Sequence, residues 1–185
     1  MKARRYASIS YCLGRQLVKL TMPTLIAAHK RVAERARMTD QLEVAALHRI
    51  GSASPQKRER YSFDFVVNGV SLFEATQAFK YDMCGSLSNP QFEREEARQI
   101  NSRTAAMLTS DVPVGGHRVA LFVCPECGDF ACGAITARVS RTELGVQWSD
   151  FAYENGLDTA SKLGLGPFEF EWAAYLTEIE RSKAD

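Results

Sequence analysis

The strongest constraint on the fold comes from one segment, YSFDFVVNGVSLFEA, which spans residues 61–75. Phe63, Phe65 and Val67 alternate with other residues in the period of a half-buried β-strand. Asn68-Gly69 follows at once, and this dipeptide supplies the two positive φ angles of a tight two-residue turn. The segment therefore predicts a β-hairpin.

Further strands are predicted in the second half of the chain. Residues 118–123, 134–139 and 144–151 each have strand character, and short connections join them. Three such strands favour an antiparallel meander. A short fourth strand is predicted at residues 168–170.

Two helices accompany these strands. Residues 92–110 follow the Asn89-Pro90 breaker and place apolar side chains loosely on one side of a helix. A C-terminal helix carries an apolar face made of Trp172, Tyr175, Leu176 and Ile179. The combined pattern predicts an α+β fold, an antiparallel sheet of about five strands with one or two helices packed on one face.

Charge divides the chain into unlike parts. Residues 1–37 carry nine Lys or Arg against one acid, a net charge of +8, whereas residues 38–185 carry fourteen against twenty-one, a net charge of −7. Residues 1–37 are therefore expected to be a basic N-terminal extension. Residues 38–60 are expected to form a short helix (41–50) and a linker (51–60), followed by the α+β domain at 61–185.

Several hypotheses fit the basic extension. It resembles a transit peptide in composition, and its cations could attract nucleic acid or anionic lipid. It could also be a flexible or partly helical extension, with apolar residues at helical spacing after Pro23: Leu25, Ala28, Val32 and Ala36. Alternatively, Met38 is the natural start of the protein.

Hydropathy and cysteine content indicate a location. No apolar run approaches the ~18 residues that a membrane-spanning helix needs. The five cysteines are an odd number without a convincing secretory signal before them. We therefore expect a cytoplasmic protein with reduced thiols.

Three of those cysteines, Cys124, Cys127 and Cys132, lie close together between two predicted strands. The sequence CPECG has the form of a zinc knuckle, because two thiolates spaced by two residues can bind one ion. A structural zinc site needs four ligands, and the chain lacks a second C-x-x-C motif. Cys132 is a candidate third ligand, and Cys84 or His117 is a candidate fourth.

Two other hypotheses concern the same cysteines. A C-x-x-C pair can form a disulfide in thiol-redox chemistry, although Glu126 and Asp129 place negative charge beside the thiols and disfavour thiolate. Alternatively, the cysteines are small buried residues at strand ends, with Pro125 and Gly128 shaping the turn.

No other arrangement indicates catalysis, so the domain is expected to act by binding. His117 is the only histidine within residues 61–185, and no glycine-rich phosphate loop is present. The net negative charge suggests, as an alternative function, an immunity or inhibitor protein that neutralises a basic toxin. The aromatic residues of the second half are expected in the core: Trp148, Tyr153, Phe168, Phe170 and Trp172.

Four motifs in order carry a resemblance to a known group: NGVSL, RVALFVCPECGDFACGAITARV, VQWSDFAYEN and GPFEFEWAAYL. Over approximately residues 60–180 the chain resembles a family of small bacterial proteins of uncharacterised function, with CPECGDxxCGA, WSDF and GPFxF motifs. The resemblance implies no activity and carries over no catalytic residue. It implies that these are family positions: Cys124, Cys127, Gly128, Asp129, Cys132, Gly133, Trp148, Asp150, Gly166, Pro167, Phe168 and Tyr175.

Overall fold

The computed structural model describes residues 9–13, 16–20, 39–53, 56–87, 94–158 and 160–182. The chain divides into two units, Met1–Thr39 and Asp40–Asp185. In the first unit, β1 (Ile9–Leu13) and β2 (Gln16–Leu20) form an antiparallel hairpin. The helical pattern predicted from Leu25 to Ala36 lies outside the described residues.

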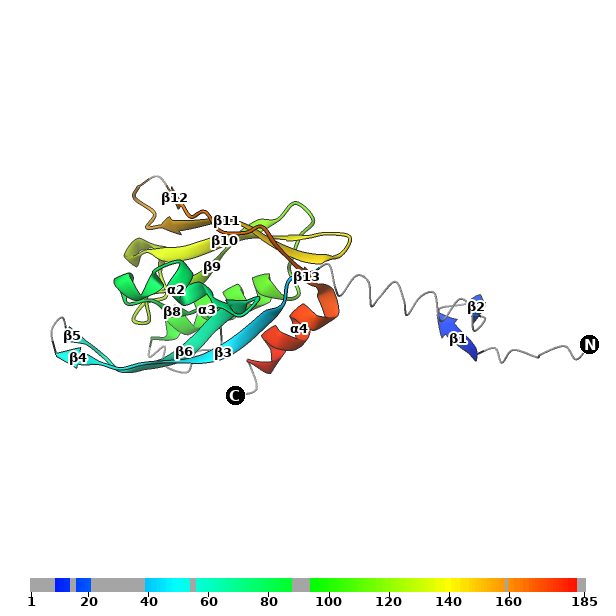
Figure 1. The fold of residues 1–185 in the computed structure, drawn as a ribbon, viewed down its shortest axis with the longest axis horizontal. Coiled ribbons are helices and arrows are strands. Elements are labelled where there is room, and N and C mark those ends of the chain that lie inside the picture. Colours follow the sequence, from blue (N-terminus) through cyan, green and yellow to red (C-terminus); the bar gives the residue numbers. More distant parts are fainter. Residues whose placement is uncertain are drawn as a thin grey trace, which may run out of the picture. The chain divides into compact units, whose positions relative to one another are not determined.

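The larger sheet of the second unit has the strand order β12-β11-β10-β9-β8, and β13 also pairs with β11 (Figure 1). All of its pairings are antiparallel, so the predicted meander of three strands is confirmed at β9, β10 and β11. The strand bounds are β8 (Cys84–Gly85), β9 (His117–Val123), β10 (Ala134–Arg141), β11 (Gly145–Glu154), β12 (Ser161–Lys162) and β13 (Phe168–Glu171).

A second sheet has the order β3-β6-β7. The predicted hairpin is confirmed in it: Asn68 (φ 52°) and Gly69 (φ 79°) make the turn between β6 (Arg60–Val67) and β7 (Val70–Ser71). The predicted helix at 41–50 is wrong, because these residues form β3 (Leu42–Arg49). Long-range pairing with β6 and burial of alternate apolar side chains outweigh the helix preference of its Leu, Glu and Ala residues.

The predicted linker at 51–60 is also wrong in part. It contains β4 (Ser52–Ala53) and β5 (Gln56–Lys57), which pair with each other beyond the end of the β3–β6 pair. The second compact unit therefore begins at Asp40 and not at residue 61. The start of this unit is fixed to β13, because the backbone N–H of Asp40 donates to the carbonyl oxygen of Glu169 at 2.6 Å.

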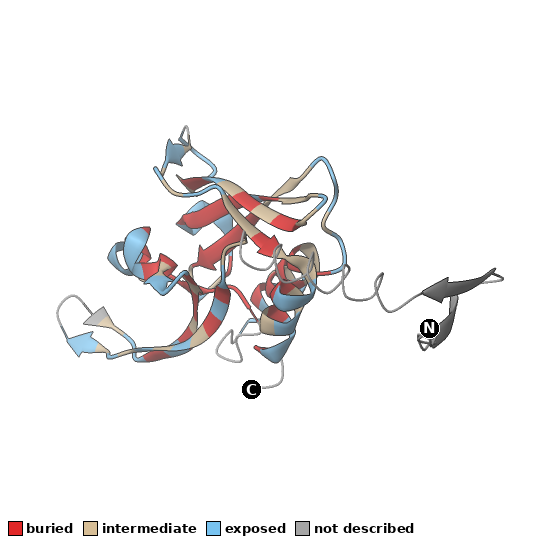
Figure 2. Cartoon of the chain, turned by 45° about the vertical axis from the view of Figure 1, so that its right-hand side comes forward, coloured by how far each residue is buried: buried red, intermediate tan, exposed pale blue. Residues whose placement is uncertain are grey.

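The core lies between the two sheets. Phe65 of β6 makes edge contacts with Phe122 of β9 and Trp148 of β11, with ring centroids 5.6 and 5.3 Å apart. Buried residues are concentrated along these strands (Figure 2). The predicted placement of aromatic residues in the core is confirmed for Trp148 and Phe170, which are buried, while Tyr153, Phe168 and Trp172 are partly buried against it.

Helices and short segments complete the unit. Helix α3 (Glu95–Leu108) contacts β9, and α4 (Trp172–Arg181) contacts β3, β11 and β13. The short elements are α2 (Leu72–Ala75), η1 (Ala78–Tyr81) and η2 (Phe130–Cys132). The α+β prediction is confirmed by this arrangement of helices packed on an antiparallel sheet.

Among the helices that the structure describes, none is long and apolar enough to cross a membrane.

Candidate metal site

The three clustered cysteines lie in the connection between β9 and β10. Val123, the last residue of β9, pairs with Ala134, the first residue of β10. Cys124 therefore follows one strand directly, and a single residue, Gly133, separates Cys132 from the other. The strand pairing brings the two ends of the connection together, and we call residues 124–133 the cysteine turn.

Backbone hydrogen bonds and two glycines give the cysteine turn its shape. The N–H of Gly128 donates to the carbonyl oxygen of Cys124, and that of Gly133 donates to Phe130, both at 2.8 Å. Gly128 (φ 66°) and Gly133 (φ 92°) have positive φ angles, which other residues adopt at a cost. Asp129 begins η2 by accepting a hydrogen bond from the N–H of Ala131.

This backbone brings the three thiols together. The Sγ atoms of Cys124, Cys127 and Cys132 all lie within 4.8 Å of one another, so the group could hold a metal ion. The Sγ atoms of Cys127 and Cys132 are 3.3 Å apart, and the N–H of Asp129 lies 3.5 Å from the Sγ of Cys127. Cys132 is exposed, while Cys124 and Cys127 are half-buried.

The two candidate fourth ligands lie elsewhere. Cys84 pairs with Val123 in the sheet and is fully buried in a small cluster with Ala97, Ala120 and Ala134. His117 stands at the opposite end of β9, where its Nε2 lies 2.9 Å from the carbonyl oxygen of Met107. In the described part of the chain, the side chains close enough together to bind a metal are those of the three cysteines of the turn. Cys84 and His117 do not belong to this group.

An ion pair, which sequence reasoning missed, changes the electrostatics of the cysteine turn. Glu126 accepts a hydrogen bond from Arg60 of β6, whose side chain is 8% exposed, and Arg58 lies 3.8 Å from the same carboxylate. The Arg60 hydrogen bond is the main cause that lowers the pKa of Glu126. The negative charge of Glu126, which was expected to disfavour thiolate at the neighbouring cysteines, is therefore compensated by Arg60. No local sequence signal links residues 66 positions apart.

The thiols also influence one another. The contact with Cys127 is the main cause that raises the pKa of Cys132 to about 12, followed by burial and by the neighbouring Cys124. Crowded thiols resist simultaneous ionisation because each new thiolate repels the others. A bound cation would reverse this effect, since metal binding releases the thiol protons.

The cysteine turn is packed on both sides. A methyl group on Gly128 would come within 3.5 Å of the Cα of Ala97, so the turn lies against the first turn of α3. At Gly133 the same addition would come 2.7 Å from the Oη of Tyr153. Tyr153 in turn stacks on Tyr81, with ring centroids 4.5 Å apart. These contacts fix the position of the turn relative to α3 and β11.

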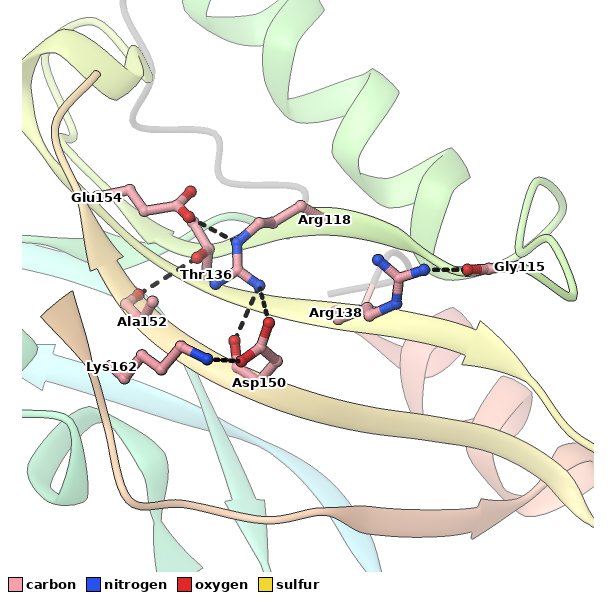
Figure 3. Close-up of polar contacts among 8 residues, drawn as sticks. All are labelled: Gly115, Arg118, Thr136, Arg138, Asp150, Ala152, Glu154 and Lys162. Atoms are coloured by element: carbon pink, nitrogen blue, oxygen red, sulfur yellow. Dashed lines mark hydrogen bonds and ion pairs between the residues drawn. The ribbon is translucent and has the colours of Figure 1, made fainter. Parts of the chain in front are cut away.

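A second polar cluster lies on the larger sheet (Figure 3). Arg118 donates to the carboxylate of Glu154 at 2.6 Å and to the backbone oxygen of Asp150 at 2.8 Å, while Lys162 lies 3.5 Å from the Asp150 carboxylate. Asp150 has a φ of 52° beside a register shift between β10 and β11. Asp150 is exposed while Trp148 and Phe151 are both buried, so the alternation of buried and exposed residues along β11 is interrupted there. These charges are mutually paired and hold the bulge.

Comparison of the chain with protein-family models, with curated proteins and with solved structures gave no match.

Proposed function

We propose that the cysteine turn is a zinc site in a non-enzymatic binding domain, with Cys124, Cys127 and Cys132 as thiolate ligands. The observation that carries the proposal is the placement of three Sγ atoms within 4.8 Å of one another. Zinc binds thiolates at about 2.3 Å in a tetrahedral arrangement, which separates the sulfurs by roughly 3.8 Å. Small side-chain rotations would bring the three sulfurs to that separation.

The surroundings of the thiols support a bound cation. Three thiolates and one Zn²⁺ carry a net charge of −1, so further negative charge nearby would weaken the site. The ion pair with Arg60 compensates the charge of Glu126, which lies between two of the ligands. The backbone N–H of Asp129 also faces the Sγ of Cys127, a contact that stabilises thiolate ligands in metal sites.

The proposed role of the metal is structural. All three ligands belong to one connection between neighbouring strands, and Cys132 is exposed at its end. A bound ion would tie the exposed residues 129–132 to the half-buried Cys124 and Cys127. Neither Cys84 nor His117 joins the group, so the site would have three protein ligands and not the four of a closed structural site, and its fourth position would hold a small ligand such as water.

The test is a metal assay on the reduced full chain without a histidine tag. The protein is loaded with zinc, separated from free metal by gel filtration and analysed by elemental mass spectrometry. We expect about one zinc per chain in the wild type and its loss in Cys127→Ser. A wild-type protein that retains no zinc after this loading would contradict the proposal.

The matched control replaces a cysteine outside the turn. Cys84→Ala removes a buried thiol that lies outside the cluster, so this variant should retain zinc. Cobalt substitution adds a spectroscopic readout, because thiolate-to-cobalt charge-transfer absorption reports the thiolates bound. The absorption per cobalt should fall in each single variant of the turn and remain unchanged in Cys84→Ala.

A further inference from the structure

Cys127 and Cys132 are closer to each other than a metal site alone requires. Their Sγ atoms are 3.3 Å apart, in direct contact. The C-x-x-C motif would instead pair Cys124 with Cys127. The contact therefore favours a disulfide between Cys127 and Cys132, which the C-x-x-C motif does not predict.

We infer that Cys127 and Cys132 form a reversible intramolecular disulfide, and that this bond and the metal compete for the same sulfurs. The disulfide depends only on the placement of the two thiols. Its competition with the metal rests on the proposed zinc site.

The backbone around the pair permits the sulfurs to approach. Each cysteine is followed by a glycine with a positive φ angle, Gly128 and Gly133, and the N–H of each glycine closes a backbone turn by donating to Cys124 or Phe130. A disulfide between them would enclose only the four residues 128–131. Closure from 3.3 Å to the bonded distance of about 2.05 Å requires a movement of little more than 1 Å.

The pair is also accessible to a reagent. Cys132 is exposed and Cys127 is half-buried, in contrast to Cys84, which is fully buried. Susceptibility of thiols to oxidation follows their exposure as well as their ionisation. A small soluble disulfide can therefore reach the pair in the folded protein.

The reaction balances with a disulfide oxidant such as oxidised glutathione. One cysteine thiolate attacks the glutathione disulfide, forms a mixed disulfide and releases the first glutathione thiolate. The second cysteine sulfur then displaces the other glutathione. Overall the two cysteines lose two electrons and two protons, and the glutathione disulfide is reduced to two thiols.

Oxidation would dismantle the proposed metal site. The disulfide removes two of its three thiolates and leaves Cys124 alone. One thiolate is too few for a protein zinc site, which needs at least three protein ligands. Metal release should therefore accompany formation of the Cys127–Cys132 bond.

Peptide mapping tests the pairing. The metal-free full chain is treated with oxidised glutathione, remaining thiols are alkylated, and the protein is digested with trypsin and proteases that cleave after Glu and before Asp. Cleavage after Glu126 and before Asp129 places each cysteine of the turn on its own peptide. We expect the peptides carrying Cys127 and Cys132 to be linked, with Cys124 alkylated.

Two variants control this result. Cys124→Ser retains the pair and should form the same bond, whereas Cys132→Ser should yield only glutathione adducts. Circular dichroism of the reduced variants establishes that each is folded. Linkage of Cys124 to either partner in the wild type, or glutathione adducts without any linkage, would overturn the inference.

A second measurement separates this inference from the proposed function. Zinc-loaded protein is treated with the same oxidant, and released zinc is followed with a chromogenic chelator. Release that parallels the Cys127–Cys132 linkage supports the competition, and linkage with full retention of zinc overturns it. A chain that binds no zinc contradicts the proposed function, while peptide mapping of the same chain still decides the disulfide.

Discussion

The aromatic core and the cysteine turn are held by different kinds of contact. In the core, Trp148 packs against Phe65, Phe170 and Tyr175 with ring centroids 5.3 to 6.0 Å apart, and each of these side chains is at most 1% exposed. In the turn, the backbone is shaped by two short hydrogen bonds and two glycines with positive φ angles. The core is held by many contacts among buried side chains, and the turn depends on a few specific interactions.

The difference indicates how each region responds to change. Burial of a large aromatic side chain contributes to the stability of the whole unit, because packing in the interior is continuous. A contact in an exposed turn acts mainly on local geometry. Core substitutions should therefore lower global stability, and turn substitutions should act first on the thiol cluster.

Replacement of Trp148 by Ala should have the largest effect on the free energy of unfolding. The side chain is fully buried between the two sheets, so its removal loses apolar burial and leaves a cavity. We expect the free energy of unfolding to fall by about 3–5 kcal/mol, measured by urea denaturation.

The control for this prediction is Phe130→Ala in the cysteine turn. Phe130 is also aromatic but is 37% exposed, so its loss should cost less than about 1 kcal/mol. Similar losses of stability in the two variants would show that the core and the turn do not differ in the way proposed.

The core was largely predictable because its signals are local. Alternation around Phe63 and Phe65, the Asn68-Gly69 turn and the apolar face of α4 are all visible in the sequence. The strand β3 was not predictable, because its Leu, Glu and Ala residues also favour a helix. Its partner, β6, follows only after the β4–β5 pair. The register shift at Asp150 has no local signal either, because it depends on the pairing of β10 with β11.

An intermediate effect is expected from Gly133→Ala. Gly133 has a φ of 92°, and an added Cβ would lie 2.7 Å from the Oη of Tyr153. We expect a loss of about 1–3 kcal/mol in unfolding free energy, together with weaker zinc binding by the displaced Cys132. Urea denaturation and zinc competition with a chelator measure the two effects.

Gly115→Ala is the matched control, because an added Cβ there meets no atom within 4 Å. This variant should leave zinc affinity unchanged and alter stability only slightly. Equal effects at Gly115 and Gly133 would show that the contact with Tyr153 does not position the turn.

The cysteine turn was predictable only in part. The spacing of Cys124, Cys127 and Cys132 predicts a common site, and the structure brings these three together. The roles proposed for Cys84 and His117 required knowledge of the sheet, in which Cys84 is buried beside Val123 and His117 lies at the far end of β9. The family resemblance, the cytoplasmic location and a protein partner stay predictions.

The smallest effect on stability should come from loss of the ion pair between Arg60 of β6 and Glu126 of the cysteine turn. Arg60 lowers the pKa of Glu126 below its ordinary value of 4.5 in the folded chain. A carboxyl group with a lowered pKa stabilises the folded state above its unfolded pKa, and the contribution is lost as the pH falls through the folded value. Because Glu126 is 46% exposed, we expect Glu126→Gln to cost less than about 1 kcal/mol at pH 7.

The pH dependence distinguishes this ion pair from a general effect of charge. Urea denaturation of metal-free protein should show the wild type more stable than Glu126→Gln at pH 7, with the difference shrinking below about pH 4.5. Glu143→Gln removes the same charge from an exposed turn and serves as the control. A stability difference at Glu126 that is constant from pH 7 to pH 3 would show that the Arg60 contact does not act through the carboxylate charge. The turn would then be attached to β6 by packing, as the core is, and the contrast between the two regions would weaken.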